Sequence, residues 1–243
     1  MSFQDQVAVV TGATSGVGKA IALELARQGA VVCLVGRRQQ VVDAVAEEAN
    51  VSPSRIVCVQ ADLMQDAAIN DLQARLSEAV RQIDLLVHSA GVTTYGSIDD
   101  TPVTDLDVLY RTNLRAPYAV TRALLPMLQR RQGQVTFINS TAGLSSRGGL
   151  GLYAASKHGL RAMADGLRDE VNGRGIRVLS VYLGRTATPR QEQLHALENR
   201  PYRPEDLIQP EDVARALLAL LSLPRTVEVT DVTLRPMRKP LST

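Results

Sequence analysis

Tyr153 and Lys157 are the two residues of this chain whose types and spacing most directly suggest chemistry. They are four positions apart, so on a helix they would lie on the same face. The ordinary pKa of a phenol is about 10, and it exchanges protons near neutral pH only if a nearby positive charge lowers that pKa. Because the ammonium of Lys157 is spaced to supply such a charge, Tyr153 is predicted to act as a general acid or base on a substrate oxygen.

A glycine-rich segment, residues 11–18 with the sequence TGATSGVG, is a candidate phosphate-binding loop. It follows a predicted strand and leads into a predicted helix, which is the context that a dinucleotide-binding loop requires. Glycines permit a tight turn and let phosphate groups approach the backbone. The helix N-terminus adds free N–H groups and the positive end of a dipole. The segment therefore predicts a dinucleotide site.

The rest of the chain alternates short apolar runs with longer stretches of helical spacing. The runs contain many Val, Ile and Leu residues without strict alternation, as expected of strands that are covered on both faces. Strands are predicted at 6–11, 30–35, 55–60, 85–88, 134–140, 177–183 and 229–234. Helices are predicted at 18–28, 39–49, 66–81, 115–131, 152–172 and 210–221. This order predicts an α/β fold: one domain over 1–243 with a doubly wound, Rossmann-type parallel sheet of about seven strands and helices on both faces.

Composition excludes several other classes of protein. The 243 residues are 45% hydrophobic and 21% charged, which is close to the average of globular domains. A net charge of +2 with 3% aromatic residues gives no support for nucleic-acid binding. No apolar run reaches the roughly 18 residues of a membrane span, and the first residues carry no basic signal-peptide region. Cys33 and Cys58 lie in apolar runs and are predicted to be buried thiols, so we expect a cytoplasmic protein without a metal site.

The spacing of the glycines, with three residues between the first two, and the Tyr-x-x-x-Lys motif resemble the short-chain dehydrogenase/reductase family over nearly the whole chain. The resemblance implies hydride transfer between a nicotinamide cofactor and a carbonyl or secondary-alcohol substrate. It implies that Ser140, thirteen positions before Tyr153, holds the substrate oxygen. It also adds Asn113 to the catalytic set, as a residue that holds Lys157 through water.

Three segments depart from the family pattern. The family usually has Ser-Ser at the end of the fifth strand, where this chain has Asn139-Ser140. The family usually has Asn-Asn-Ala-Gly after the fourth strand, where this chain has His88-Ser89-Ala90-Gly91. It usually has Pro-Gly after the sixth strand, where this chain has Leu183-Gly184. We expect His88 to be a hydrogen-bonded histidine of the core rather than a catalytic group.

Arg37 and Arg38, at the end of the second predicted strand, favour NADP(H) over NAD(H). Dinucleotide folds that prefer NAD usually carry an acidic residue at this point, whereas arginine can pair with a 2′-phosphate. Asp62 matches the position that contacts the adenine ring, or it caps the next helix. The expected cofactor-binding residues are Gly12, Thr14, Ser15, Gly16, Val17, Gly18, Arg37, Arg38, Asp62, Leu63, Ala90, Gly91, Tyr153, Lys157, Gly184 and Thr188.

Residues 185–209 are the longest irregular stretch and are expected to form a substrate lid, or alternatively a surface excursion with a short helix at 190–198. The substrate pocket is expected to be lined by Thr93, Tyr95, Ala142, Leu144, Ser145, Arg147 and Arg185. Arg147 and Arg185 could attract a carboxylate or phosphate on the substrate, or they could be solvated residues at the rim.

Two alternative functions remain open from the sequence. One is a 3-oxoacyl-carrier-protein reductase, in which Arg131 and Arg174 would contact the acidic carrier; both could instead complement helix dipoles. The other is a dinucleotide-binding regulator without turnover, although such proteins tend to lose the tyrosine and lysine. The resemblance further implies a homo-oligomer, a tetramer or dimer, built on the helices 115–131 and 152–172.

Overall fold

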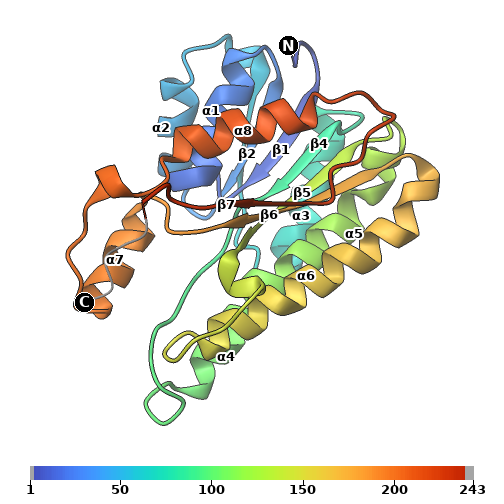
Figure 1. Cartoon of the computed structure of the whole chain (residues 1–243). Helices are drawn as coiled ribbons and strands as arrows, with labels where there is room; N and C mark the ends of the chain where they lie inside the picture. Colours follow the sequence, from blue (N-terminus) through green and yellow to red (C-terminus); the bar gives the residue numbers. More distant parts are fainter. Residues whose placement is uncertain (1–2, 239–243) are drawn as a thin grey trace.

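A computed structural model describes residues 3–238 and contains one seven-stranded, wholly parallel sheet (Figure 1). The strands are β1 (Val7–Thr11), β2 (Val31–Gly36), β3 (Ile56–Gln60), β4 (Leu85–His88), β5 (Gln134–Ser140), β6 (Arg177–Leu183) and β7 (Asp231–Leu234). Their order is β3-β2-β1-β4-β5-β6-β7, so the winding reverses between β1 and β4. The predicted doubly wound parallel sheet is confirmed.

Helices cover both faces of the sheet. They are α1 (Gly16–Arg27), α2 (Gln39–Glu48), α3 (Asp66–Ala79), α4 (Val103–Tyr110), α5 (Ala116–Gln129), α6 (Gly151–Val171), α7 (Pro189–Leu197) and α8 (Pro210–Leu221). In Figure 1, α1, α2 and α8 lie on one face, and α3, α5 and α6 lie on the other. Figure 1 also shows α7 and α4, at two separate places, extending beyond the sheet.

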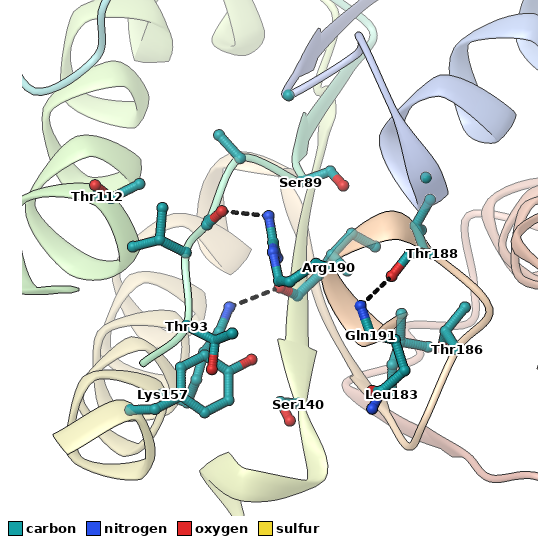
Figure 2. A pocket seen from close by; sticks show the side chains of 18 of the residues that line it. Ser89, Thr93, Thr112, Ser140, Lys157, Leu183, Thr186, Thr188, Arg190 and Gln191 are labelled. Atoms are coloured by element: carbon teal, nitrogen blue, oxygen red, sulfur yellow. Dashed lines mark hydrogen bonds between the residues drawn. The ribbon is translucent and has the colours of Figure 1, made fainter. Parts of the chain in front are cut away.

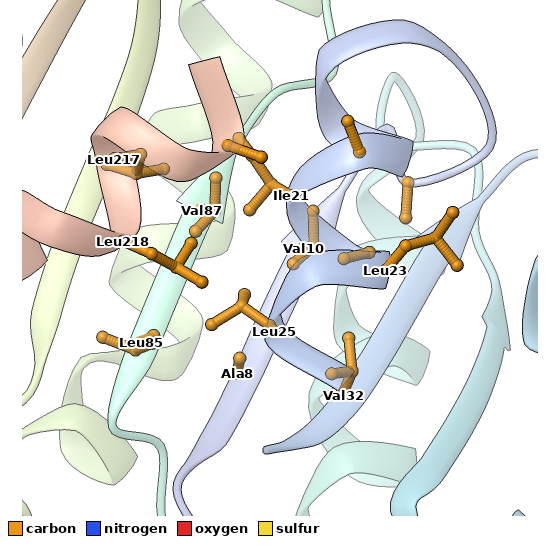
Figure 3. Close-up of a cluster of buried hydrophobic side chains, with 14 of the residues drawn as sticks. Ala8, Val10, Ile21, Leu23, Leu25, Val32, Leu85, Val87, Leu217 and Leu218 are labelled. Atoms are coloured by element: carbon orange, nitrogen blue, oxygen red, sulfur yellow. The ribbon is translucent and has the colours of Figure 1, made fainter. Parts of the chain in front are cut away.

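The two faces of each central strand bury different apolar side chains. Ala8 and Val10 of β1 pack with α1 and α8. Figure 3 shows Ala8 and Val10 beside Ile21 and Leu25 of α1. The alternate residues of β1 belong to the core on the opposite face, under α3, α5 and α6. Because side chains alternate along a strand, a strand covered on both faces needs an unbroken apolar run.

The structure differs from the sequence prediction at several boundaries. Helix α1 begins at Gly16 rather than at 18, α3 ends at Ala79 rather than 81, and β7 begins at Asp231 rather than 229. Helix α4 was not predicted, nor was the π-helical turn Arg111–Arg115 that joins it to α5. Helix α4 is only eight residues long, buries Leu109 alone and leaves Val103, Leu106, Val108 and Tyr110 exposed.

Residues 185–209, expected to be irregular, contain α7 and a 3₁₀ turn at Pro204–Asp206. Thr188 begins α7 by accepting a hydrogen bond from the Gln191 N–H at 3.2 Å, and Pro189 occupies the first helical position. This agrees with the short helix of the alternative prediction. That the segment opens and closes as a lid stays a prediction.

Across residues 3–238, no helix is both long enough and apolar enough to cross a bilayer. The same residues hold no cluster of His, Cys, Asp and Glu suited to a metal ion.

Candidate active site

A cavity of about 680 Å³ lies at the carboxyl ends of the strands, around the point where the strand order reverses. Parallel sheets usually bind their ligands at this position. Most predicted site residues line it: Gly12, Thr14, Ser15, Gly16, Val17, Arg37, Asp62, Leu63, Ala90, Gly91, Ser140, Tyr153, Lys157, Gly184 and Thr188. The predicted residues Gly18, Arg38 and Asn113 do not line it.

The glycine loop is packed closely against the segment that follows β4. Gly12 has a φ of +67°, and a Cβ there would lie 2.7 Å from the Cα of Ala90. Thr11 Oγ1 accepts hydrogen bonds from the backbone N–H groups of Ser89 (3.2 Å) and Ala90 (3.3 Å). A side chain on Gly18 would overlap the Gly12 carbonyl. Gly18 therefore packs against the backbone of the loop and does not line the cavity.

The N-terminus of α1 gives the cavity an anion-binding character. The helix starts at Gly16, its first turn has no acidic residue, and the side chain of Ser15 makes no capping hydrogen bond. The first N–H groups of a helix lack partners within the helix, and the dipole makes this end positive. The loop and α1 are therefore suited to hold the phosphates of a dinucleotide.

Of the two predicted arginines after β2, only Arg37 lines the cavity, whereas Arg38 is the N-cap residue of α2. Asp62 Oδ1 accepts a hydrogen bond from the Met64 N–H at 3.1 Å and so stabilises the turn after β3. The alternative prediction that Asp62 caps the next helix is wrong, because α3 begins at Asp66 with Gln65 as its N-cap.

Tyr153 and Lys157 on α6 meet Ser140 at the end of β5. Lys157 Nζ lies 6.0 Å from the centre of the Tyr153 ring and donates a hydrogen bond to the Ile138 carbonyl at 3.2 Å. Ser140 Oγ accepts a hydrogen bond from the Ala142 N–H at 3.1 Å, and the Ser140 hydroxyl interacts with the Tyr153 phenol. A phenol, a hydroxyl and an amine thus line the same cavity, in which Figure 2 shows Ser140 and Lys157.

The pKa values of this group correct one sequence prediction. Burial raises the pKa of Tyr153, and the hydrogen bond with Ser140 and the charge of Arg190 oppose that rise. Burial, helped by Arg190, lowers the pKa of Lys157 itself to about 7. A phenol with an ordinary pKa of about 10 is already protonated at neutral pH, and burial strengthens that preference.

Two asparagines position the catalytic group. Asn139 Nδ2 donates to the Lys157 carbonyl (3.1 Å), and Asn139 Oδ1 accepts from the Ser140 N–H (2.7 Å), so one buried side chain links both residues. Sequence reasoning treated Asn139 only as a departure from the family pattern. The strand gave no signal for this role, because β5 also carries the polar residues Gln134, Thr136 and Ser140.

Asn113 is fully buried in the π-helical turn. Its Oδ1 accepts from the Val92 N–H (2.8 Å), and its Nδ2 donates to the Val92 carbonyl (2.9 Å) and to Ser156 Oγ (3.0 Å). The side chain therefore ties the segment after β4 to α6, next to Lys157. A π-helical turn often marks a functional position in a helix. The predicted link to Lys157 through water stays a prediction.

His88 is a core histidine, as predicted. Its Nε2 is 2.8 Å from Thr121 Oγ1, and its ring stacks on Phe137 with centroids 5.0 Å apart. Burial lowers its pKa to about 3, so it is neutral at physiological pH. Cys33 is buried as predicted, but Cys58 is only half-buried, because it lies on β3 at the edge of the sheet.

The substrate side of the cavity includes Thr93, Ala142, Ser145, Arg147 and Arg185, as predicted. The predicted Tyr95 and Leu144 do not line it. The ring of Tyr95 is placed against Gly149 instead, where a Cβ would lie 2.6 Å from the ring. Leu144 is exposed to solvent.

Glu198, just after α7, forms ion pairs with both Arg147 and Arg185, although its own side chain is only 2% exposed. Burial favours the neutral acid, but the hydrogen bonds and charges of the two arginines outweigh it and lower the pKa of Glu198. Both arginines predicted to attract an anionic substrate therefore already have a carboxylate partner. Sequence reasoning missed Glu198, as it missed Arg190, which also lines the cavity.

Arg131 and Arg174, predicted to contact an acyl carrier, lie before β5 and β6, at the amino edge of the sheet opposite the cavity. Arg131 pairs with Asp84 at 2.8 Å, and Asp84 also accepts a hydrogen bond from the Val7 N–H. Arg174 donates to the Glu170 carbonyl at the end of α6, which agrees with a helix-terminal role.

The chain is similar to known proteins along most of its length. A family model described as short chain dehydrogenase matches residues 6–199. An uncharacterized oxidoreductase of Staphylococcus epidermidis is 31% identical over 235 residues, which cover 96% of this chain and 98% of the relative. A metagenomic short-chain oxidoreductase in complex with NADP has 29% identity and a TM-score of 0.83, over 98% of this chain and 100% of the other. The closed form of serine dehydrogenase complexed with NADP⁺ has 26% identity and a TM-score of 0.86, over 98% of each chain.

Proposed function

The chain belongs to the short-chain dehydrogenase family of oxidoreductases, and we propose that it transfers hydride between NADP(H) and a carbonyl or secondary-alcohol substrate. The observation that carries the proposal is the convergence of Ser140, Tyr153 and Lys157 in the cavity that also contains the glycine loop. A proton-transfer group and a phosphate-binding loop in one cavity are what a nicotinamide-dependent reductase needs.

The residues present fit an NADP(H) cofactor. The glycine loop and the N-terminus of α1 would hold the diphosphate, and Arg37 would pair with the 2′-phosphate. No carboxylate stands at the end of β2 to repel that phosphate. The bound nicotinamide would supply or accept the hydride. Two solved relatives are complexes with NADP, which supports the same choice of cofactor.

Tyr153 would donate its proton to the carbonyl oxygen during reduction and accept it during oxidation. At neutral pH the phenol is protonated, which is the state that proton donation to a carbonyl oxygen requires. Ser140 would donate a hydrogen bond to the same substrate oxygen. Lys157, held at Nζ by the Ile138 carbonyl and at its backbone by Asn139, would be a proton-exchanging neighbour, since its pKa of about 7 lets both protonation states exist near neutral pH.

NADPH consumption against a panel of carbonyl compounds tests this proposal. The panel contains small 3-oxo acids, their esters, an acetoacetyl thioester, diketones, aldehydes and sugars, and each is assayed with NADPH and with NADH. We expect turnover with at least one class and a preference for NADPH. Binding of NADPH without turnover of any class would favour the dinucleotide-binding regulator instead.

The position of Arg131 and Arg174 at the far edge of the sheet gives no support to an acyl-carrier substrate. Preferential turnover of the acetoacetyl thioester in the panel would instead favour an acyl-carrier substrate.

We also propose that the protein is a homo-oligomer, a tetramer or dimer. Tyr118 on α5 and Val103, Leu106, Val108 and Tyr110 on α4 are exposed. An exposed apolar patch of this kind is typical of an interface. Light scattering at micromolar concentration tests the proposal, and a particle of about 26 kDa, the mass of one chain, would contradict it.

A further inference from the structure

Arg190, the second residue of α7, reaches into the cavity. One of its guanidinium nitrogens, Nη2, donates a hydrogen bond to the Gly91 carbonyl. Figure 2 shows the side chain extending from α7 into the middle of the cavity, between Ser89 and Lys157. The guanidinium thus lies between the lid segment and the catalytic wall.

The charges around Arg190 make an anion the missing partner. Glu198 pairs with Arg147 and Arg185 and lies 3.9 Å from Arg200, but within residues 3–238 Arg190 forms no ion pair. The like charges of Lys157 and Arg37 interact unfavourably with it, whereas the phenol of Tyr153 interacts favourably. A cation that is partly desolvated among like charges is destabilised until an anion neutralises it.

The start of α7 lies beside the phosphate-binding loop. Thr188, the N-cap residue of α7, packs against Gly16, since a Cβ on Gly16 would lie 2.9 Å from Thr188 Cγ2. Gly16 is the first residue of α1, whose N-terminus is the anion site described above. Arg190 follows Thr188 by two residues, and its guanidinium meets the Gly91 carbonyl in the cavity that the loop also lines.

We propose that Arg190 binds the diphosphate of the dinucleotide, and that its guanidinium exchanges the Gly91 carbonyl for phosphate oxygens. The inference rests on the proposed NADP(H) function. A carbonyl offers the guanidinium one neutral acceptor, whereas a diphosphate offers several charged oxygens in the geometry of its planar fork. Because Glu198 already fixes the far end of α7, this contact would fasten α7 to the cofactor at its near end as well.

Calorimetric titration of dinucleotides and a fragment tests the assignment. The proteins are the wild type, Arg190→Gln, Arg190→Lys and the control Arg203→Gln, in which the altered arginine lies in the same segment, is exposed and does not line the cavity. We expect Arg190→Gln to bind NADP⁺ and NAD⁺ about tenfold or more weakly, by the same factor for both, because the diphosphate is common to them. Affinity for 2′-AMP, which has no diphosphate, should not change. The dinucleotide affinity of Arg190→Lys should lie between those of the wild type and Arg190→Gln. The affinity of Arg203→Gln should equal that of the wild type.

Three results would overturn the assignment. Unchanged dinucleotide affinity in Arg190→Gln would show that Arg190 does not bind the diphosphate. A loss confined to NADP⁺ and 2′-AMP would show that Arg190 binds the 2′-phosphate. Unchanged dinucleotide affinity with a raised KM for a 3-oxo acid, but not for its ester, would show that Arg190 binds a substrate carboxylate. If the wild type itself bound neither dinucleotide, the proposed function would fail instead. Circular dichroism of each variant checks that it is folded.

Discussion

Replacing Glu198 by glutamine is predicted to destabilise the protein measurably at neutral pH. The carboxylate is buried to 2% exposure and accepts from two arginines, of which Arg147 is 48% exposed and Arg185 is 17% exposed. Removing one partner of a buried ion pair costs roughly 3–5 kcal/mol. Solvent screens Arg147, and glutamine keeps the size and one acceptor oxygen, so we expect a loss of about 2–3 kcal/mol. For a chain of this length, that loss lowers the melting temperature by about 4–12 °C.

Thermal unfolding followed by circular dichroism measures the effect. Glu192→Gln is the matched control, because Glu192 is exposed on α7, and its melting temperature should stay within about 2 °C of the wild type. The pKa of Glu198 is lowered in the folded protein, so its contribution is present above the unfolded pKa of about 4.3 and is lost as the pH falls through the folded value. The wild type and Glu198→Gln should therefore converge at acid pH. A Glu198→Gln melting temperature equal to the wild type at pH 7, or a difference that persists unchanged in acid, would refute the reasoning.

Two further predictions concern the cofactor and the core. Arg37→Ser should weaken NADP⁺ binding about tenfold or more and leave NAD⁺ binding unchanged, whereas Arg38→Ser should change neither much, because Arg38 does not line the cavity. Equal effects of the two variants in calorimetric titration would contradict the placement of Arg37 at the 2′-phosphate. The pKa of His88 is about 3 in the folded protein, below its unfolded value of about 6.5, so its protonation in the unfolded state should reduce stability as the pH falls from 6.5 towards 3. Urea titrations at several pH values give the free energy of unfolding, which should depend less on pH in His88→Asn than in the wild type. The same pH dependence in both proteins would indicate that other groups cause it.

The parts of the site that the sequence predicted are those that depend on local spacing. Tyr153 and Lys157 share one turn of helix, and the glycine loop needs only the strand before it and the helix after it. The strands were equally readable, because burial on both faces requires an unbroken apolar run. These features are set within a few neighbouring residues.

The parts that sequence reasoning missed depend on contacts between distant residues. Glu198 meets Arg147 across 51 positions, and Arg190 meets Gly91 across 99. Nothing in the local sequence of α7 reveals either partner. The pKa of Tyr153 was expected to fall because of Lys157, but burial raises it, and burial depends on the whole surrounding fold. Helix α4 was missed because its packing leaves apolar residues exposed.

The most direct test of the central claim is NADPH oxidation by Tyr153→Phe on the best carbonyl substrate of the wild type, with NADPH affinity measured in parallel. Phenylalanine keeps the ring and removes only the hydroxyl that interacts with Ser140. The account predicts that NADPH affinity changes by less than about threefold, while turnover falls by about 10²-fold or more. Turnover within about tenfold of the wild type, with affinity intact, would contradict the role of Tyr153 as the proton donor.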